Sequence, residues 1–357
     1  MVPAMRSTPS FSIRIAHWQR QHGRHGLPWQ GTRDPYRVWL SEVMLQQTQV
    51  ATVLDYYPRF LRRFPDVAAL AAAPEGDVMA LWSGLGYYRR ARHLHQCARQ
   101  VVERLGGQFP RSAARLEALP GIGPSTAAAI AAFYFGERAA IFDGNVQRVL
   151  ARWLGDAGDL ASAAHVKTLR ERAQTLLPPS SADMPAYTQG LMDLGALICT
   201  PRQPRCSHCP LAEDCAARRQ GCPERYPVKT RKPRRAAQTL WLLLASAPDA
   251  PPASSPAAIW LEQRPAQGIW AGLHALPAFD SRPALLAALP ADARASITWL
   301  PPVTHALTHK TLTLHTARAR LPATQALLIP GQWRADWPTL GLPAPMRRLM
   351  QGERADA

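Results

Sequence analysis

The sequence predicts an all-α domain followed by a smaller α+β domain, and three observations lead to this prediction. Apolar residues recur at helical spacing through roughly the first 215 residues, and no segment there alternates with the period of a strand. Beyond residue 238 the period changes, and residues 311–316 alternate between apolar and polar side chains. Residues 224–237 between the two regions are rich in Arg, Lys and Pro, which is typical of a linker. We therefore expect domains at 11–223 and 238–350.

Composition points to a polyanionic partner. The 357 residues include 42 Lys and Arg against 25 Asp and Glu, which gives a formal net charge of +17. Such an excess favours nucleic acid first and a membrane surface second. The sequence has no apolar run of about 18 residues and no signal-peptide core at its start, so we expect a protein without a membrane span.

The helices of the first domain can be placed from caps and periodicity. Asp34 and Pro35 form a strong helix start, with Asp as N-cap and Pro at the first helical position. Glu42 is the only acid of the helix that follows, and its apolar neighbours predict partial burial. The other predicted helices are 11–22, 50–64, 66–73, 75–82, 89–105, 112–119, 124–135, 146–154, 161–177 and 185–198.

Residues 119–127 (LPGIGPSTA) form a turn between two of these helices. Gly121 and Gly123 permit backbone angles that other residues resist, so the turn can be tight. Its N–H groups, beside a helix N-terminus, would suit a DNA phosphate, and Ser125 lies in the first turn of that helix. An ordinary helix–turn–helix corner explains the same residues.

A cysteine cluster predicts a metal site. Cys199, Cys206, Cys209 and Cys215 are separated by six, two and five residues. Thiolates bind soft metals, so iron–sulfur and zinc are the choices, and the compact spacing favours iron–sulfur. His208 is interpreted as a bystander, and Cys97 and Cys222 as free thiols or core filler.

Two carboxyl groups could perform acid chemistry. A buried Glu42 would have a raised pKa and could donate a proton, while an ionised Asp143 could stabilise a sugar cation. Asp143 precedes Gly144 and Asn145, so helix capping alone also explains it. The residue types leave both interpretations open.

Four motifs together resemble the adenine DNA glycosylases of the MutY type, in the endonuclease III superfamily. They are residues 41–50 (SEVMLQQTQV), residues 85–88 (LGYY) with Arg89 and Arg92, the hairpin at 119–127 with Asp143, and the cysteine spacing. The resemblance implies a helix-hairpin-helix glycosylase domain with a 4Fe-4S cluster. It further implies base excision repair of adenine mispaired with 8-oxoguanine or guanine in double-stranded DNA. We expect a monomer in the bacterial cytoplasm, associated with the nucleoid.

The resemblance also implies a role for each site residue. Glu42 would protonate the adenine, Asp143 would stabilise the cation and Asn145 would position water. The opposing 8-oxoguanine would contact Gln46, Gln47, Thr48 and Tyr87, and the flipped adenine would contact Trp29, Gln30 and Gln189. Bifunctional relatives place a lysine where this chain has Ser125, so we expect no strand cleavage.

Residues 262–265 (EQRP), residues 268–273 (GIWAGL) and Pro277 make the second domain resemble the Nudix-like domain of the same family. Strands are predicted at 238–244 and 257–263, which form a hairpin across the loop at 247–256, and a helix at 282–289. That helix lacks the acids of catalytic Nudix domains, so reading of 8-oxoguanine is implied instead of nucleotide hydrolysis. Thr308 and His309 lie where the family has a Phe-Ser-His loop, with Leu307 in place of the phenylalanine.

Two other functions remain as alternatives. A thymine-glycol or uracil-type glycosylase of the same superfamily is disfavoured by Ser125 and by the Nudix-like domain. A non-catalytic, cluster-bearing DNA-binding protein is disfavoured by the presence of both Glu42 and Asp143.

Overall fold

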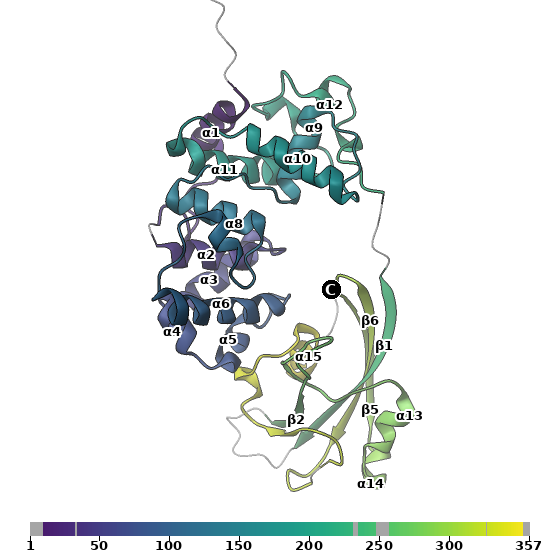
Figure 1. Cartoon of the computed structure of the whole chain (residues 1–357). Helices are drawn as coiled ribbons and strands as arrows, with labels where there is room; N and C mark the ends of the chain where they lie inside the picture. The colour runs from purple at the N-terminus through teal and green to yellow at the C-terminus, as the bar shows by residue number, and fades with distance from the viewer. Residues whose placement is uncertain (1–9, 33, 231–234, 248–256, 326, 353–357) are drawn as a thin grey trace, which may run out of the picture. The chain divides into compact units, whose positions relative to one another are not determined.

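The computed structural model (Figure 1) describes residues 10–32, 34–230, 235–247, 257–325 and 327–352. It divides into two compact units, one comprising residues 1–72 and 96–232, the other 73–95 and 233–357. Residues 73–95, which the sequence assigns to the first domain, group with the second unit, so the predicted domain boundaries stay a prediction. Residues 1–9, 231–234 of the linker and most of the loop at 247–256 lie outside the described residues.

The first unit is helical, as predicted. Its helices are α1 (Phe11–His22), α2 (Pro35–Leu45), α3 (Val50–Arg63), α4 (Val67–Ala72), α7 (Ala113–Glu117), α8 (Pro124–Ile130), α9 (Gly144–Leu154), α10 (Ala163–Thr175), α11 (Met184–Asp193) and α12 (Ala216–Arg219). The helix α6 (Arg89–Leu105) begins in the second unit and ends in the first. Short π-helical turns at Ala131–Phe135 and Leu194–Ile198 continue α8 and α11 to the predicted ends. The described residues contain no helix that is both long and apolar enough to cross a membrane.

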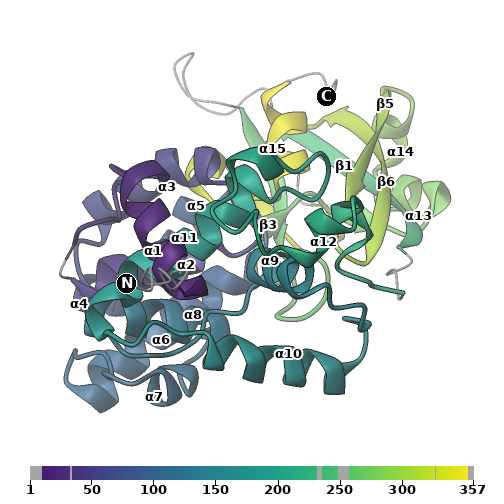
Figure 2. The same ribbon diagram turned by 90° about the horizontal axis from the view of Figure 1, so that it is seen from above.

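Buried faces of α1, α9 and α11 form the core behind the site. α1 and α11 pack side by side (Figure 2), and Ile15 of α1 is in the same cluster as Val146 of α9 and Leu191 of α11. Gly190 permits this close approach, because a Cβ there would lie 2.8 Å from the Ile15 side chain. The packing fixes the position of α1 relative to α9 and α11, which carry the predicted site residues Asn145 and Gln189.

The hairpin between α7 and α8 has one glycine in the left-handed region. Gly121 has φ +76°, whereas Gly123 has φ −87° and caps α8 with ordinary extended backbone. The expectation that both glycines adopt angles other residues resist is therefore wrong for Gly123. A single left-handed residue reverses the chain, and Gly123 leaves open space beside the helix N-terminus.

The second unit contains a mixed sheet of seven strands, in the order β3-β2-β1-β6-β5, with β4 paired to β1 and β7 to β2. The strands are β1 (Ala236–Ala247), β2 (Ala258–Gln263), β3 (His274–Ala275), β4 (Ala278–Phe279), β5 (Thr298–Ala306), β6 (Lys310–Arg320) and β7 (Gln332–Arg334). The predicted hairpin is confirmed, since β1 and β2 pair antiparallel with Ser246 opposite Ile259. β1 also runs parallel to β6, with Ala236 opposite Lys310.

Within the described residues, four complete α-helices also belong to this second unit. They are α5 (Glu75–Trp82), α13 (Arg282–Ala287), α14 (Ala291–Arg294) and α15 (Ala344–Gln351). Leu285 of α13 is fully buried in the core that Leu243 of β1 also joins. The loop after α5 is anchored by two hydroxyls, because Ser83 Oγ and Tyr88 OH both donate to the carbonyl of Leu342, at 2.8 and 2.9 Å.

Candidate active site and metal centre

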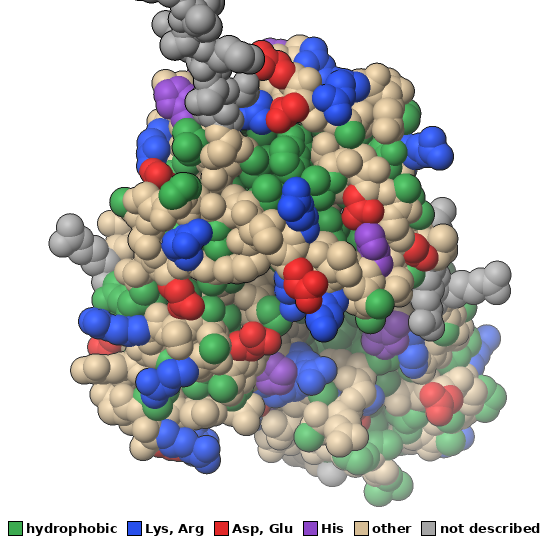
Figure 3. Space-filling view, turned by 45° about the horizontal axis from the view of Figure 1, so that its top comes forward, with side chains coloured by type: hydrophobic (Ala, Val, Ile, Leu, Met, Phe, Trp, Pro, Cys, Tyr) green, Lys and Arg blue, Asp and Glu red, His purple; other side chains and the backbone are tan. Residues whose placement is uncertain are grey.

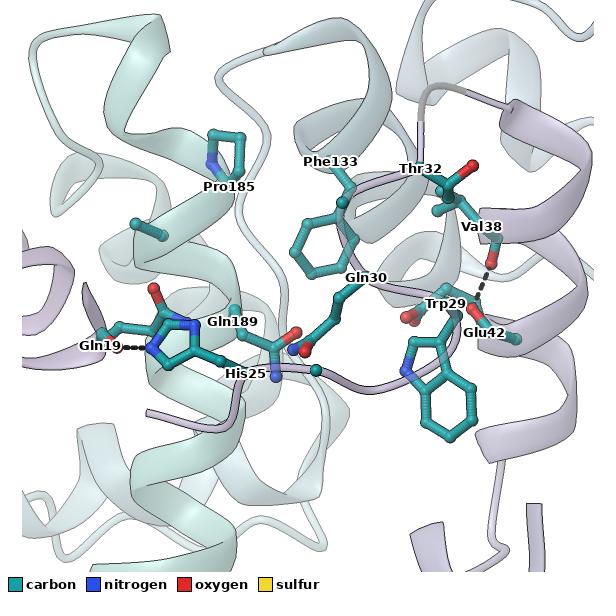
Figure 4. A pocket seen from close by; sticks show the side chains of 14 residues that line it. Gln19, His25, Trp29, Gln30, Thr32, Val38, Glu42, Phe133, Pro185 and Gln189 are labelled. Atoms are coloured by element: carbon teal, nitrogen blue, oxygen red, sulfur yellow. Dashed lines mark hydrogen bonds between the residues drawn. The ribbon is translucent and has the colours of Figure 1, made fainter. Parts of the chain in front are cut away.

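A cavity of about 570 Å³ opens in the helical unit (Figure 4). Its walls come from α1, the loop between α1 and α2, α2 itself, the π-helical turn after α8 and the start of α11. The lining residues include Trp29, Gln30, Val38, Ser41, Glu42, Phe133 and Gln189. Its volume lies in the range of small-molecule sites and can take a nucleotide base. The structure thus brings Glu42, Trp29, Gln30 and Gln189, four of the residues singled out from the sequence, to one cavity.

Glu42 lies on the wall of this cavity with a perturbed carboxyl group. Asp34 caps α2 by accepting from the Tyr36 amide at 2.9 Å, which fixes the start of the helix two turns before Glu42. Burial, together with a smaller contribution from the nearby Asp143 carboxyl, raises the pKa of Glu42 to about 8. A carboxyl with this pKa is mostly protonated at neutral pH and can act as an acid.

Asp143 is the N-cap of α9. Its Oδ1 accepts from the Val146 amide at 2.8 Å. Burial raises the pKa of Asp143, while backbone N–H groups and the Arg148 guanidinium act in the opposite direction. Asp143 therefore both caps α9 and lies near the other carboxyl. One of its oxygens accepts from the helix N-terminus, while its charge contributes to the raised pKa of Glu42.

The side chains of Asn145 and Ser125 accept hydrogen bonds from residues close to Asp143 in the sequence. Asn145 Oδ1 accepts from Arg148 Nη2 at 2.8 Å, and the same guanidinium donates to the carbonyl oxygens of Cys199 and Gly195. Ser125 Oγ accepts from the Phe142 amide at 3.3 Å, which joins the hairpin helix α8 to the segment just before Asp143.

The segment after α2 contains the polar residues 46–48. Gln46 Nε2 donates to Thr126 Oγ1 at 3.1 Å and to the Gly121 carbonyl at 3.4 Å, so this amide is held against the hairpin. Gln47 is exposed and has φ +57°, an uncommon conformation for glutamine. Thr48 Oγ1 donates to the Gln46 carbonyl at 3.5 Å.

The other residues predicted to contact 8-oxoguanine lie in the second unit. Tyr87 has φ +49° and a 46% exposed side chain, and the Arg90 guanidinium lies 5.5 Å from its ring centroid. Thr308 and His309 are exposed in the tight turn between β5 and β6, which the Leu307 amide closes by donating to the Lys310 carbonyl at 2.7 Å.

The four cysteines of the predicted cluster line one cavity in the helical unit. Cys199, Cys206, Cys209 and Cys215 surround it together with Arg152 and Arg218. Burial, together with smaller contributions from the other three sulfurs, raises the pKa of the Cys209 thiol to about 12. Four thiols around one cavity, with two cations nearby, fit the chemistry of an anionic thiolate-bound metal centre, because a metal ion offsets the cost of the charged sulfurs. His208, Cys97 and Cys222 do not line this cavity.

Several residues of these sites carried no signal in the sequence. Arg152 is 2% exposed and donates to the carbonyl oxygens of Thr200, Pro201 and Tyr226 at 2.7 to 3.1 Å. His25 and Phe133 line the first cavity, and buried Asp193 lies one turn beyond Gln189 on α11. An arginine in an amphipathic helix or an aspartate at a helix end is usually solvated, so only the folded chain distinguishes these residues.

Models of three families match the chain. Residues 40–179 match the HhH-GPD superfamily base excision DNA repair proteins, residues 199–215 the iron–sulfur binding domain of endonuclease III, and residues 253–352 a NUDIX domain. The predicted fold class and the 4Fe-4S cluster as cofactor are thereby confirmed.

Curated relatives cover most of the chain. An adenine DNA glycosylase of Buchnera aphidicola is 35% identical over 272 residues, which are 76% of this chain and 76% of that protein. One from Mus musculus is 45% identical over 217 residues, 58% of this chain and 42% of that protein. One from Mycobacterium tuberculosis is 40% identical over 223 residues, 62% of this chain and 70% of that protein.

Solved structures resemble the helical part of the chain. A thermostable thymine-DNA glycosylase matches with a TM-score of 0.53 and 31% identity, over 59% of this chain and 95% of that one. A trapped endonuclease III–DNA covalent intermediate matches with a TM-score of 0.50 and 20% identity, over 59% of this chain and 94% of that one, which supports the fold alone.

Proposed function

The chain belongs to the adenine DNA glycosylase family, and from this premise we propose that it hydrolyses the N-glycosidic bond of adenine mispaired with 8-oxoguanine or guanine in double-stranded DNA. The raised pKa of Glu42, on the wall of a cavity that can take a base, is the observation that carries the proposal. We place this reaction in the cytoplasm, on nucleoid DNA, with the enzyme as a monomer.

Glu42 and Asp143 divide the chemistry between them. Glu42 donates its proton to the departing adenine, at N7, which turns the base into a better leaving group. Asp143, ionised, stabilises the positive charge that develops on the sugar as the bond breaks. Asn145, held by Arg148, positions the water that completes the hydrolysis. The flipped adenine lies in the cavity against Trp29, Gln30 and Gln189.

The reaction ends at an abasic site. Strand cleavage by bifunctional relatives needs an amine that forms a Schiff base with the sugar, and Ser125 cannot supply one. Ser125, Gly121 and Gly123 instead present the hairpin to a DNA phosphate, where N–H groups at the start of α8 bind an anion.

We expect the base opposite the adenine to be recognised by polar and aromatic side chains, namely Gln46, Gln47, Thr48, Tyr87, Thr308 and His309. Tyr87 stacks into the duplex, which its exposed ring supports. Leu307 cannot stack on a base as a phenylalanine would, so the turn at 307–310 relies on the polar groups of Thr308 and His309.

Cys199, Cys206, Cys209 and Cys215 would hold the 4Fe-4S cluster. When bound, the cluster cross-links a loop that presents Arg202 and Arg205 to the DNA backbone. The α13 helix carries no acid to bind magnesium, so the Nudix-like domain reads the opposing base and does not hydrolyse nucleotides.

Single-turnover cleavage assays test this function. A duplex with adenine opposite 8-oxoguanine is incubated with excess enzyme, and strand breaks are measured with and without alkali. We expect breaks only after alkali, and a loss of roughly a hundredfold or more for Glu42→Gln and Asp143→Asn without loss of duplex binding. Borohydride trapping of the wild type, or excision by Glu42→Gln at the wild-type rate, would contradict the proposal.

A further inference from the structure

Asp193 is a completely buried carboxylate just outside the adenine cavity. It is the last residue of α11 and 0% exposed. Its Oδ2 accepts from the Arg24 backbone amide at 2.8 Å, and its Oδ1 accepts from Arg24 Nε at 2.7 Å. Gln189 Nε2, one helical turn earlier, also donates to Oδ1, at 2.8 Å. Each of these partners is a donor, so the carboxylate acts here as an acceptor throughout.

This contact fixes which way the Gln189 amide turns. A glutamine amide has a donor end and an acceptor end that differ little in shape, and its orientation is set by its partners. The Asp193 carboxylate accepts hydrogen bonds, so the Gln189 amide must turn its NH₂ group toward Asp193. The other end of the amide, Oε1, is then left to face the cavity. Within the described residues, this oxygen accepts no hydrogen bond, and Gln189 lines the cavity (Figure 4).

Gln30 is another amide of the cavity wall, and it is engaged in its own loop. Gln30 Oε1 accepts from the Leu27 amide at 3.0 Å, and Gln30 Nε2 donates to the Arg24 carbonyl at 3.0 Å. Gln30 therefore closes the loop at 24–30 that also presents Arg24 to Asp193. Gln189, by contrast, keeps an oxygen available to a base, and Gln19 of α1 is a further amide that lines the cavity.

We propose that Asp193 is a positioning residue that makes the enzyme selective for a 6-amino purine. By holding the NH₂ group of Gln189, it turns Oε1 toward the exocyclic N6 amine of adenine, which is a donor. A 6-oxo purine such as hypoxanthine presents an acceptor at the same place, so two acceptors would face each other without a proton. The inference rests on the proposed function and specifies how its substrate is selected.

Asp193→Asn tests the proposal with little change of size. The new amide can donate to Gln189, which lets the glutamine turn over and present its NH₂ group to the base. Single-turnover excision rates are measured on duplexes that carry adenine, hypoxanthine or unsubstituted purine opposite the same base. We expect the ratio of the adenine rate to the hypoxanthine rate to fall by about tenfold or more relative to wild type, the effect of one hydrogen bond.

Two further variants separate base reading from folding. Gln189→Met leaves the contact between Arg24 and Asp193 intact but removes the amide, so the ratio of the adenine rate to the purine rate should fall by about tenfold. Asp183→Asn is the matched control, because Asp183 precedes the same helix, pairs with Arg20 and does not line the cavity. This control should leave every rate ratio unchanged.

The outcomes distinguish the inference from the proposed function. If Asp193→Asn slows all three substrates equally, Asp193 has only a structural role and the inference is wrong. If Gln189→Met keeps the wild-type ratio of adenine to purine, Gln189 does not read the amine and the inference is equally wrong. Failure of the wild type to excise adenine would instead overturn the proposed function.

Discussion

At the scale of single residues, the site depends on two carboxyl groups in different surroundings. Glu42 lies among apolar side chains on α2, and burial is the main cause of its raised pKa. Burial also raises the pKa of Asp143, but backbone N–H groups at the start of α9 and the Arg148 guanidinium oppose this shift and favour the charged form. The fold thus pairs a buried carboxyl that keeps its proton with a carboxyl whose charged form has donors beside it, as acid-assisted bond cleavage requires.

The pH dependence of excision follows from these two groups. Glu42 must be protonated to act, so the single-turnover rate should stay level up to about pH 8 and then fall about tenfold per pH unit. On the acid side, the rate should fall as Asp143 gains a proton. Rates measured from about pH 5 to pH 10 check this, with Glu42→Gln as a slow control that lacks the alkaline limb. A wild-type rate that rises between pH 7 and pH 9 would show that Glu42 is not the acid.

At the scale of elements, the hairpin between α7 and α8 depends on one backbone conformation. Alanine is strained at the φ of +76° found for Gly121 but not at the φ of −87° found for Gly123, where a Cβ would meet open space. Gly121→Ala should therefore lower the free energy of unfolding by about 1 kcal/mol or more, while Gly123→Ala should change it by less than about 0.5 kcal/mol. Denaturant unfolding of both variants measures this, and equal losses would contradict it.

The cysteine loop depends on Arg152 of α9. This buried guanidinium donates to four backbone carbonyls and lies 3.3 Å from Cys199 Sγ, so it joins α9 to the start of the loop and to the segment that follows the loop. A lysine has a single donor atom and cannot reproduce this set of bonds. We expect Arg152→Lys to contain less iron per protein and to melt about 5 °C or more below wild type.

Arg218→Lys is the control for the cysteine loop. Arg218 also lines the cavity of the four cysteines, but it is exposed and lies on α12. Iron content and melting temperature should stay at the wild-type values. If Arg152→Lys retains the same iron as this control, Arg152 does not hold the loop.

At the scale of the whole molecule, the excess of positive charge determines how the chain meets DNA. On the face drawn in Figure 3, Lys and Arg side chains are spread over the surface and interspersed with fewer acids. A net charge of +17 distributed in this way favours contact with phosphates at many points, each of which releases counterions.

Affinity for undamaged duplex should therefore fall steeply with salt. We expect a loss of about a hundredfold or more between about 50 and 200 mM monovalent salt, measured by fluorescence anisotropy on a labelled duplex. The logarithm of the affinity should decrease linearly with the logarithm of the salt concentration. A slope close to zero would show that the basic residues do not contact phosphates.

Local signals predicted much of the fold. The Asp34-Pro35 start, the Ser112 cap and the Gly106-Gly107 stop lie where the structure has helix ends, because capping depends on neighbouring residues alone. The edge strand β5 was not predicted, since Pro301 and Pro302 interrupt its pattern and shift its register against β6. The strands β3, β4 and β7 have only two or three residues, too few for a period to show.

The sequence by itself determined the type of chemistry, because residue types and spacings persist without a fold. Glu42, Asp143 and four cysteines are present in any conformation, and their order along the chain carries the family resemblance. Only the tertiary structure decided how these groups behave. Burial against helices distant in sequence raises the pKa of Glu42, and a carboxylate on α11 orients the amide of Gln189. Desolvation and hydrogen-bond direction arise from long-range packing, which no local pattern encodes.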